Sequence, residues 1–126
     1  MPQPESKLIL AFRKIVEPLP YHWDGEKLHG GLYQSGLPDT VWTKPDGKQI
    51  WIEFKVAPRW RLELLQGRQR LVCLRWATRG VPVYVLGQDI TGGWLMDLRT
   101  FVTNPDILSL IAAGPVWLSD LVRYIK

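Results

Sequence analysis

The sequence predicts a single α/β domain built around a mixed β-sheet. Three observations support this prediction: an amphipathic helix near the N-terminus, an alternating hairpin in the middle, and an apolar strand that follows a second helix. At 126 residues the chain is long enough to bury one core without disulfides. We therefore expect one domain over 1–126, with a core over about 5–98 and a helical extension over about 99–126.

The composition is that of a globular protein, with 46% hydrophobic and 22% charged residues. The single cysteine, Cys73, excludes a disulfide framework or a thiolate metal cluster and favours an intracellular, cytoplasmic setting. The start "MPQPESK" lacks the features of a signal peptide, and no apolar run is long enough to span a membrane. The net charge of +4 permits a polyanionic partner without requiring one.

The predicted first helix lies in "ESKLILAFRKIVEPLP", residues 5–20. Its apolar residues recur at helical spacing, and two prolines end it. The Gly-rich stretch 21–36 follows as a loop leading into a short strand. The apolar positions are Leu8, Phe12, Ile15 and Val16, and the prolines are Pro18 and Pro20.

A hairpin is predicted over 37–57, with strands 37–44 and 48–57 joined by "PDG". The second strand alternates, so its side chains divide between the two faces of the sheet. We expect Ile50, Ile52, Phe54 and Val56 to point toward a core, and Gln49, Trp51, Glu53 and Lys55 to point the other way.

The rest of the chain is predicted as an irregular stretch, a helix, two strands and a helical tail. Gly80 ends the second helix, and "VPVYVLG" is apolar enough for the interior of a sheet. The corresponding ranges are 58–64 for the irregular stretch, 66–80 for the helix, 81–87 and 92–98 for the strands, and 99–126 for two short helices separated by "AAGP".

The hairpin turn sets the register of the two strands. A type I turn with Pro45 at its second position and Gly47 in the left-handed region closes the pair Lys44 and Lys48. The same register places Asp39 directly opposite Glu53, although like charges across a strand pair are destabilising. A two-residue turn would put Asp39 on the other face and would make Pro45 a pairing residue.

A divalent cation between the two carboxylates would turn this repulsion into affinity. Mg²⁺ prefers oxygen ligands and is commonly held by one or two carboxylates. Lys55 lies on the same face and is suited to contact a phosphate or a water, so the three side chains match metal-assisted phosphodiester hydrolysis. In the alternative reading, Glu53 and Lys55 are a solvated pair and Asp39 is a turn residue after Pro38.

"Pro38-Asp39" followed by "Glu53-Phe54-Lys55" resembles the signature that names the PD-(D/E)XK nuclease superfamily. The segments "SGLPDTVW", "IWIEFKVAP", "LQGRQ" and "ATRGVPVYVL" are similar to its VRR-NUC branch over about 5–87. The resemblance implies a restriction-endonuclease-like core, a mixed central sheet flanked by helices. It also implies that Asp39, Glu53 and the carbonyl of Phe54 bind Mg²⁺, that Mn²⁺ can substitute for it, and that Lys55 orients the attacking water.

Two further positions follow from the resemblance. A glutamine often opens the second helix of this branch, and Gln69 takes this place, with Gln66 as a rival because Gln66-Gly67 replaces the usual Ser-Pro start. The spacing agrees, since Gln69 shares the inward stripe with Leu65, Val72 and Trp76. A helix-border glutamine in water is the alternative. An acid on the first helix would join the metal site: Glu5, or less favourably Glu17, although Glu5 also suits a first helical turn.

Cations interleave with an aromatic just beyond the catalytic strand, at Arg59, Trp60, Arg61, Arg68 and Arg70. We assign Arg59, Arg61 and Arg68 to contact with the DNA backbone, although solvated arginines would account equally well for any one of them.

The sequence thus favours a Mg²⁺-dependent endodeoxyribonuclease. The small stand-alone relatives resemble dimeric Holliday junction resolvases, so a homodimer, branched DNA and a phage or mobile-element origin are implied. The alternatives are a nuclease for flaps, nicks or duplex ends, a DNA-binding module that has lost turnover, and a protein-interaction domain with incidental motifs.

Overall fold

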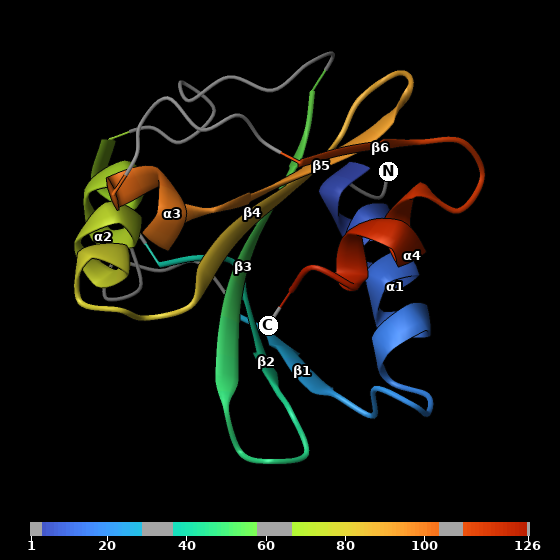
Figure 1. The fold of residues 1–126 in the computed structure, drawn as a ribbon, viewed down its shortest axis with the longest axis horizontal. Helices are drawn as coiled ribbons and strands as arrows, with labels where there is room; N and C mark the ends of the chain where they lie inside the picture. The colour runs from blue at the N-terminus through green and yellow to red at the C-terminus, as the bar shows by residue number, and fades with distance from the viewer. Residues whose placement is uncertain (1–3, 29–36, 58–66, 104–109, 126) are drawn as a thin grey trace.

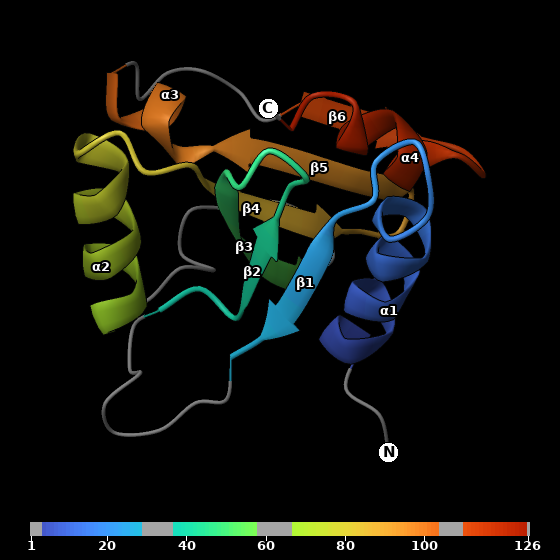
Figure 2. The same cartoon turned by 90° about the horizontal axis from the view of Figure 1, so that it is seen from below.

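The structure, a computed structural model, describes residues 4–28, 37–57, 67–103 and 110–125. It is a six-stranded sheet with helices on both faces (Figures 1 and 2). The elements in chain order are α1 (Pro4–Val16), β1 (Asp24–Lys27), β2 (Thr40–Thr43), β3 (Gln49–Val56), α2 (Gly67–Thr78), β4 (Val83–Gln88), β5 (Gly92–Asp97), α3 (Leu98–Thr103), β6 (Leu110–Ala113) and α4 (Trp117–Val122).

The strands lie in the sheet in chain order, from β1 at one edge to β6 at the other. The pair β3 and β4 is parallel and the other neighbouring pairs are antiparallel, because α2 carries the chain back across the sheet between β3 and β4. Helices α1 and α4 cover one face, and α2 and α3 cover the other (Figure 1). The predicted α/β domain with a mixed sheet is confirmed.

The predicted register of the β2–β3 hairpin is also confirmed. Lys44 N–H donates to the Lys48 carbonyl at 2.8 Å, and Gly47 adopts a φ of 87° in the left-handed region. Thr43 then pairs with Gln49 and Thr40 with Ile52. Asp39 is the next residue outward, so it lies across from Glu53, as the turn predicts.

Both faces of the sheet carry an apolar core. On the α1 side the ring of Phe12 packs against Trp42 at 4.7 Å and Phe54 at 5.4 Å between centroids. On the α2 side, side chains of β3, β4 and β5 meet α2 and α3 in a second cluster. This second cluster contains Cys73, Ala77, Val83, Val85, Trp94, Met96 and Leu98, with Trp51 and Trp76 at its border. The alternation of β3 therefore separates two cores rather than a core and solvent.

Tryptophan rings lie over glycines on neighbouring strands. Trp42 covers Gly25 and Trp94 covers Gly87, and each pair stands directly opposite in its antiparallel register. A methyl group at Gly25 or Gly87 would overlap the ring. Glycine in a strand leaves room for such a neighbour, and the aromatic ring in turn covers the exposed backbone.

Three expectations are corrected by the structure. The tail contains two short helices as predicted, but it also contains the strand β6, which pairs with β5 through small residues. Val56 was expected to face a core and is 37% exposed, because it is the last residue of β3. The seven tryptophans of the sequence are many for its length and suggest a binding surface as well as a core, yet the six described ones are buried or half-buried. The described residues include no helix suited to crossing a membrane.

We expect Gly87→Ala to destabilise the protein by about 1–3 kcal/mol, because the new methyl group forces the Trp94 ring to move. The measurement is urea unfolding of the single variants and of the double variant with Trp94→Leu. The double variant should cost less than the sum of the two single changes, because the smaller leucine side chain at position 94 removes the overlap. Strict additivity would contradict the packing described here.

Candidate active site

The candidate site lies where β2 begins, β3 ends and α2 begins. Figure 2 shows that the first turns of α1 and α2 both lie on the side of the sheet where β1 ends and β2 begins. Helix N-termini carry partial positive charge, so this side of the sheet favours anionic groups. Asp39 precedes β2, Glu53 and Lys55 belong to β3, and Gln69 belongs to the first turn of α2.

Asp39 and Glu53 hold one another through backbone hydrogen bonds. Asp39 N–H donates to Glu53 Oε1 at 3.0 Å, and Phe54 N–H donates to Asp39 Oδ1 at 3.3 Å. Leu28 N–H also donates to the Asp39 carbonyl at 2.8 Å, which ties the residue to the end of β1. The two carboxylates are therefore fixed in position by the hairpin itself.

Burial makes both carboxylates difficult to ionise. Glu53 is only 4% exposed, and its loss of solvation raises its pKa, against the opposing charge of Lys55. Burial, followed by the charge of Glu53, raises the pKa of Asp39 to about 7. A cation shared between the two carboxylates would stabilise their ionised forms. The pair therefore fits a hard divalent ion with oxygen ligands, which would keep waters in its remaining positions.

Lys55 completes the cluster with Gln69. Its Nζ lies 3.2 Å from Glu53 Oε2 and donates to Gln69 Oε1 at 3.3 Å. A hydrogen bond from Gln69 also lowers the pKa of Glu53, so the amide contacts both charged groups. Contacts with Glu53 and with Gln69 thus hold the Lys55 ammonium group in place.

The inward stripe of α2 explains how Gln69 reaches the sheet. Val72 and Cys73 are buried below it, and Trp76 packs against Trp51 with ring centroids 5.0 Å apart. Gln69 itself is half-buried and its amide is hydrogen bonded, as the cost of burying an unpaired amide requires. Its rival Gln66, and Leu65 of the predicted stripe, lie outside the described residues.

The structure does not bring the predicted third acid to the pair. Glu5 lies half-buried in the first turn of α1, and no three His, Cys, Asp or Glu side chains gather within the described ranges. Glu17, at the other end of α1, pairs with Arg13 at 3.1 Å. A metal-binding role for Glu5 stays a prediction.

Of the predicted DNA contacts, the structure describes one. Arg68 is exposed in the first turn of α2, one residue before Gln69. Arg59 and Arg61 lie outside the described residues.

Two residues near the acids were not predicted for the site. The charge of Lys27 lowers the pKa of Asp39, and its Nζ donates to Ser6 Oγ of α1 at 3.4 Å. Cys73 belongs to the second apolar cluster. Burial, then the charge of Glu53, raises the pKa of its thiol to about 12, so the thiol stays protonated below the site. The pairing of β1 with β2 places Lys27, and a local pattern does not contain it.

A solved structure with a similar fold is that of Hjc, a Holliday junction resolvase from the archaeal hyperthermophile Archaeoglobus fulgidus. The two share a TM-score of 0.52 at 17% sequence identity, over 75% of this chain and 73% of that chain. The chain has a restriction-endonuclease-like fold. The predicted fold class is therefore confirmed, whereas the VRR-NUC branch stays a prediction. No protein-family model and no curated protein sequence matches the chain.

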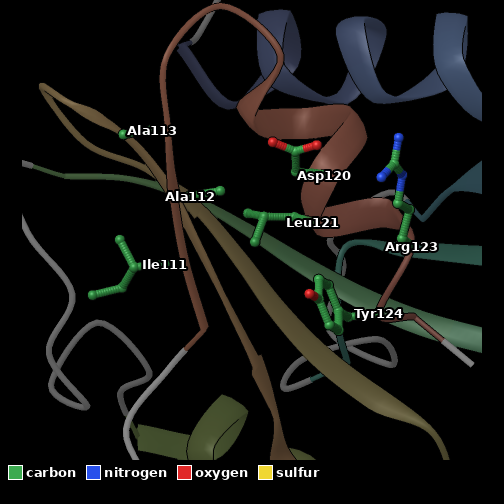
Figure 3. A pocket seen from close by; sticks show the side chains of 7 residues that line it. All are labelled: Ile111, Ala112, Ala113, Asp120, Leu121, Arg123 and Tyr124. Carbon is green, nitrogen blue, oxygen red and sulfur yellow. The ribbon is translucent and has the colours of Figure 1, made fainter.

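A separate hollow lies between β6 and α4, at the opposite edge of the sheet (Figure 3). Ala112 points toward Leu121 there, whereas Ile111 points to the other side of the strand (Figure 3). Its lining includes Asp120, Arg123 and Tyr124 of the C-terminal segment, and it shares no residue with the candidate site.

The raised carboxyl pKa values predict a characteristic pH dependence of stability. Carboxyl groups of an unfolded chain ionise near pH 4, whereas Asp39 in the folded protein ionises at about 7. Between these values the folded state binds more protons, so the free energy of unfolding falls as the pH rises from about 4 to about 7. Without added metal, the melting temperature should be higher at pH 5 than at pH 8.

Asp39→Asn should flatten this dependence, because it removes one of the two shifted groups. Asp24→Asn, which changes an exposed acid at the start of β1, is the matched control and should keep the wild-type profile. A melting temperature that rises steadily from pH 5 to pH 8 in the wild type would exclude the proposed burial of the acids.

Proposed function

We propose that the chain is a metal-dependent DNA endonuclease that hydrolyses phosphodiester bonds. The observation that carries the proposal is the cluster itself: the half-buried Asp39 and the buried Glu53, both of raised pKa, are fixed by reciprocal backbone bonds with a lysine held beside them. The motif resemblance and the likeness in fold to a resolvase add support. A purely structural pair of acids would lower stability without compensation.

Asp39 and Glu53 would hold the cation, together with the backbone carbonyl of Phe54, and Mg²⁺ or Mn²⁺ suits these oxygen ligands. A bound divalent cation supplies Lewis-acid stabilisation of charge on the phosphate and lowers the pKa of a coordinated water. Glu5 is the candidate for a further ligand. The backbone bonds from Asp39 and Phe54 keep the two carboxylates facing one another without cost at the moment of reaction.

Lys55 would orient the attacking water and stabilise charge that develops on the phosphate. Gln69 acts as a positioning residue, because its contacts with Lys55 and Glu53 fix the distance between these two side chains. Lys55 also offsets the charge of Glu53 while no cation is bound.

The proposed substrate is branched DNA, in particular a four-way junction, and the proposed assembly is a homodimer in an intracellular setting. Both rest on the family resemblance, and the fold likeness to a Holliday junction resolvase supports the substrate class. Ile111 is 69% exposed on the edge strand β6, which offers an apolar surface for a second copy. The same site would serve a nuclease for flaps, nicks or duplex ends.

The first test is cleavage of labelled four-way junction, flap and linear duplex DNA with Mg²⁺ or Mn²⁺. We expect Lys55→Ala and Asp39→Ala each to lower the cleavage rate by at least about a hundredfold, because each removes a group that stabilises the transition state. The junction should be cut faster than the linear duplex.

Lys48→Ala and Asp24→Ala are the matched controls, because both change exposed residues of the same types outside the cluster. They should cut at the wild-type rate. Intact substrates with wild type and variants alike, together with unchanged DNA binding, would replace the nuclease proposal with a DNA-binding module.

Gln69→Leu tests the positioning role. Leucine keeps the apolar stem but cannot form hydrogen bonds with Lys55 or Glu53. The cleavage rate should therefore fall by about ten- to a hundredfold, while the affinity for uncut duplex stays unchanged. The decrease should appear in the rate at saturating DNA, measured in single-turnover kinetics. A rate equal to that of the wild type would show that the amide is only a helix-border group.

A further inference from the structure

The positive charge of this chain is concentrated in one short segment. The sequence has 16 Lys and Arg against 12 Asp and Glu, a net charge of +4. Residues 67–79 contain four arginines and no other charged residue, so the rest of the chain has 12 of each sign and is neutral. These four are Arg68, Arg70, Arg75 and Arg79, in α2 and immediately after it.

Helical spacing places three of these arginines in one stripe along α2 and the turn that follows it. Arg75 and Arg79 follow Arg68 by seven and eleven residues, which keeps all three within about 40° around the helix axis. Arg79 N–H donates to the Trp76 carbonyl at 3.0 Å, so the chain continues to turn beyond Thr78. At the helical rise of 1.5 Å per residue the stripe is about 16 Å long.

The arginines of this segment face solvent, and three of them have no compensating acid within the described ranges. Arg68, Arg70, Arg75 and Arg79 are all exposed. Arg70, Arg75 and Arg79 form no ion pair with any residue in the described ranges, whereas Arg13 of α1 pairs with Glu17 and Arg99 pairs with Asp97. Arg70, Arg75 and Arg79 are therefore available to an external anion.

The stripe begins at the candidate site. Arg68 immediately precedes Gln69, whose amide contacts Lys55. From there α2 extends along the face of the sheet that it covers together with α3 (Figure 2). Guanidinium groups bind phosphate oxygens in a bidentate manner. Trp76 is turned inward against Trp51, so no tryptophan of α2 is offered to stack on unpaired bases. This favours the phosphate backbone of a duplex over a single strand.

We propose that Arg68, Arg75 and Arg79 bind the phosphate backbone of a DNA duplex arm that extends from the site of cleavage. The position of the cut relative to this arm rests on the proposed nuclease function; the contact with duplex does not. Arg75 and Arg79 thus join the DNA-binding residues expected from the sequence, and their contact with the phosphate backbone is independent of the base sequence.

The test is the salt dependence of binding of a fluorescein-labelled linear DNA duplex, followed by anisotropy in EDTA so that no metal-dependent cleavage occurs. Neutralising two phosphate contacts should lower the slope of log K against log salt by about two between about 50 and 200 mM salt. We expect this loss, with roughly tenfold weaker binding at about 100 mM salt, for the double variant Arg75→Gln with Arg79→Gln. The double variant with lysine at both positions should keep most of the wild-type slope.

The matched control removes the same two charges from the other face of the sheet. Lys14→Gln with Arg123→Gln changes exposed residues in α1 and immediately after α4, and this variant should bind the duplex as the wild type does (Figure 1). Equal weakening by both double variants would show an effect of net charge alone and would overturn the proposal. A wild-type slope in the Arg75 and Arg79 variant, or preferred binding of single-stranded DNA or duplex RNA, would also overturn it.

The outcome is separable from that of the nuclease proposal. Loss of slope in a protein that cuts no DNA would support the arginine stripe and reject the catalytic assignment. Normal cleavage and normal binding by the Arg75 and Arg79 variant would reject the stripe and leave the catalytic assignment in place.

Discussion

The register of the β2–β3 hairpin is the constraint on which the candidate site depends. The turn between Lys44 and Lys48 fixes which residues face one another, and Asp39 meets Glu53 only in this register. The backbone bonds that the two acids then receive, from Asp39 N–H and Phe54 N–H, would be lost with a slip of one residue. Lys55 lies two residues after Glu53 on the same face of β3, and its Nζ contacts both Glu53 Oε2 and Gln69 Oε1.

Burying two acids side by side opposes folding, and the packing of the surrounding structure has to offset this unfavourable free energy. The second apolar core and the helix α2 enclose Glu53. Gly87 of β4 pairs with Lys55, and the Trp94 ring that lies over Gly87 fills the face of the sheet beside Lys55. Local conflicts of this kind are typical of functional sites in otherwise consistent folds. In the proposed account, the repulsion between Asp39 and Glu53 becomes affinity for a cation.

Much of the site could be predicted from the sequence because the signals are local. Pro45 and Gly47 define the turn, the alternation of β3 defines its faces, and the helical spacing of α2 places Gln69 inward. These are properties of short segments, so they can be recognised without knowledge of the tertiary structure.

The features that were missed depend on long-range pairing. β6 forms because Ala112 and Ala113 fit opposite Gly93 and Gly92 of the predicted strand β5, whereas the segment 110–113 alone does not indicate a strand. Lys27 reaches Asp39 only through the pairing of β1 with β2. The metal-binding role of Glu5 stays a prediction, because helical spacing does not specify the position of α1 relative to the sheet.

The most direct test of the central claim is calorimetric titration of the protein with Mg²⁺ or Mn²⁺ near pH 6.5, in two buffers of different ionisation enthalpy. Because Asp39 ionises at about 7, a cation that binds between Asp39 and Glu53 must displace protons. The account predicts saturable binding with proton release in the wild type, and loss of both in Asp39→Asn. Absence of binding, or equal binding by Asp39→Asn, would contradict it.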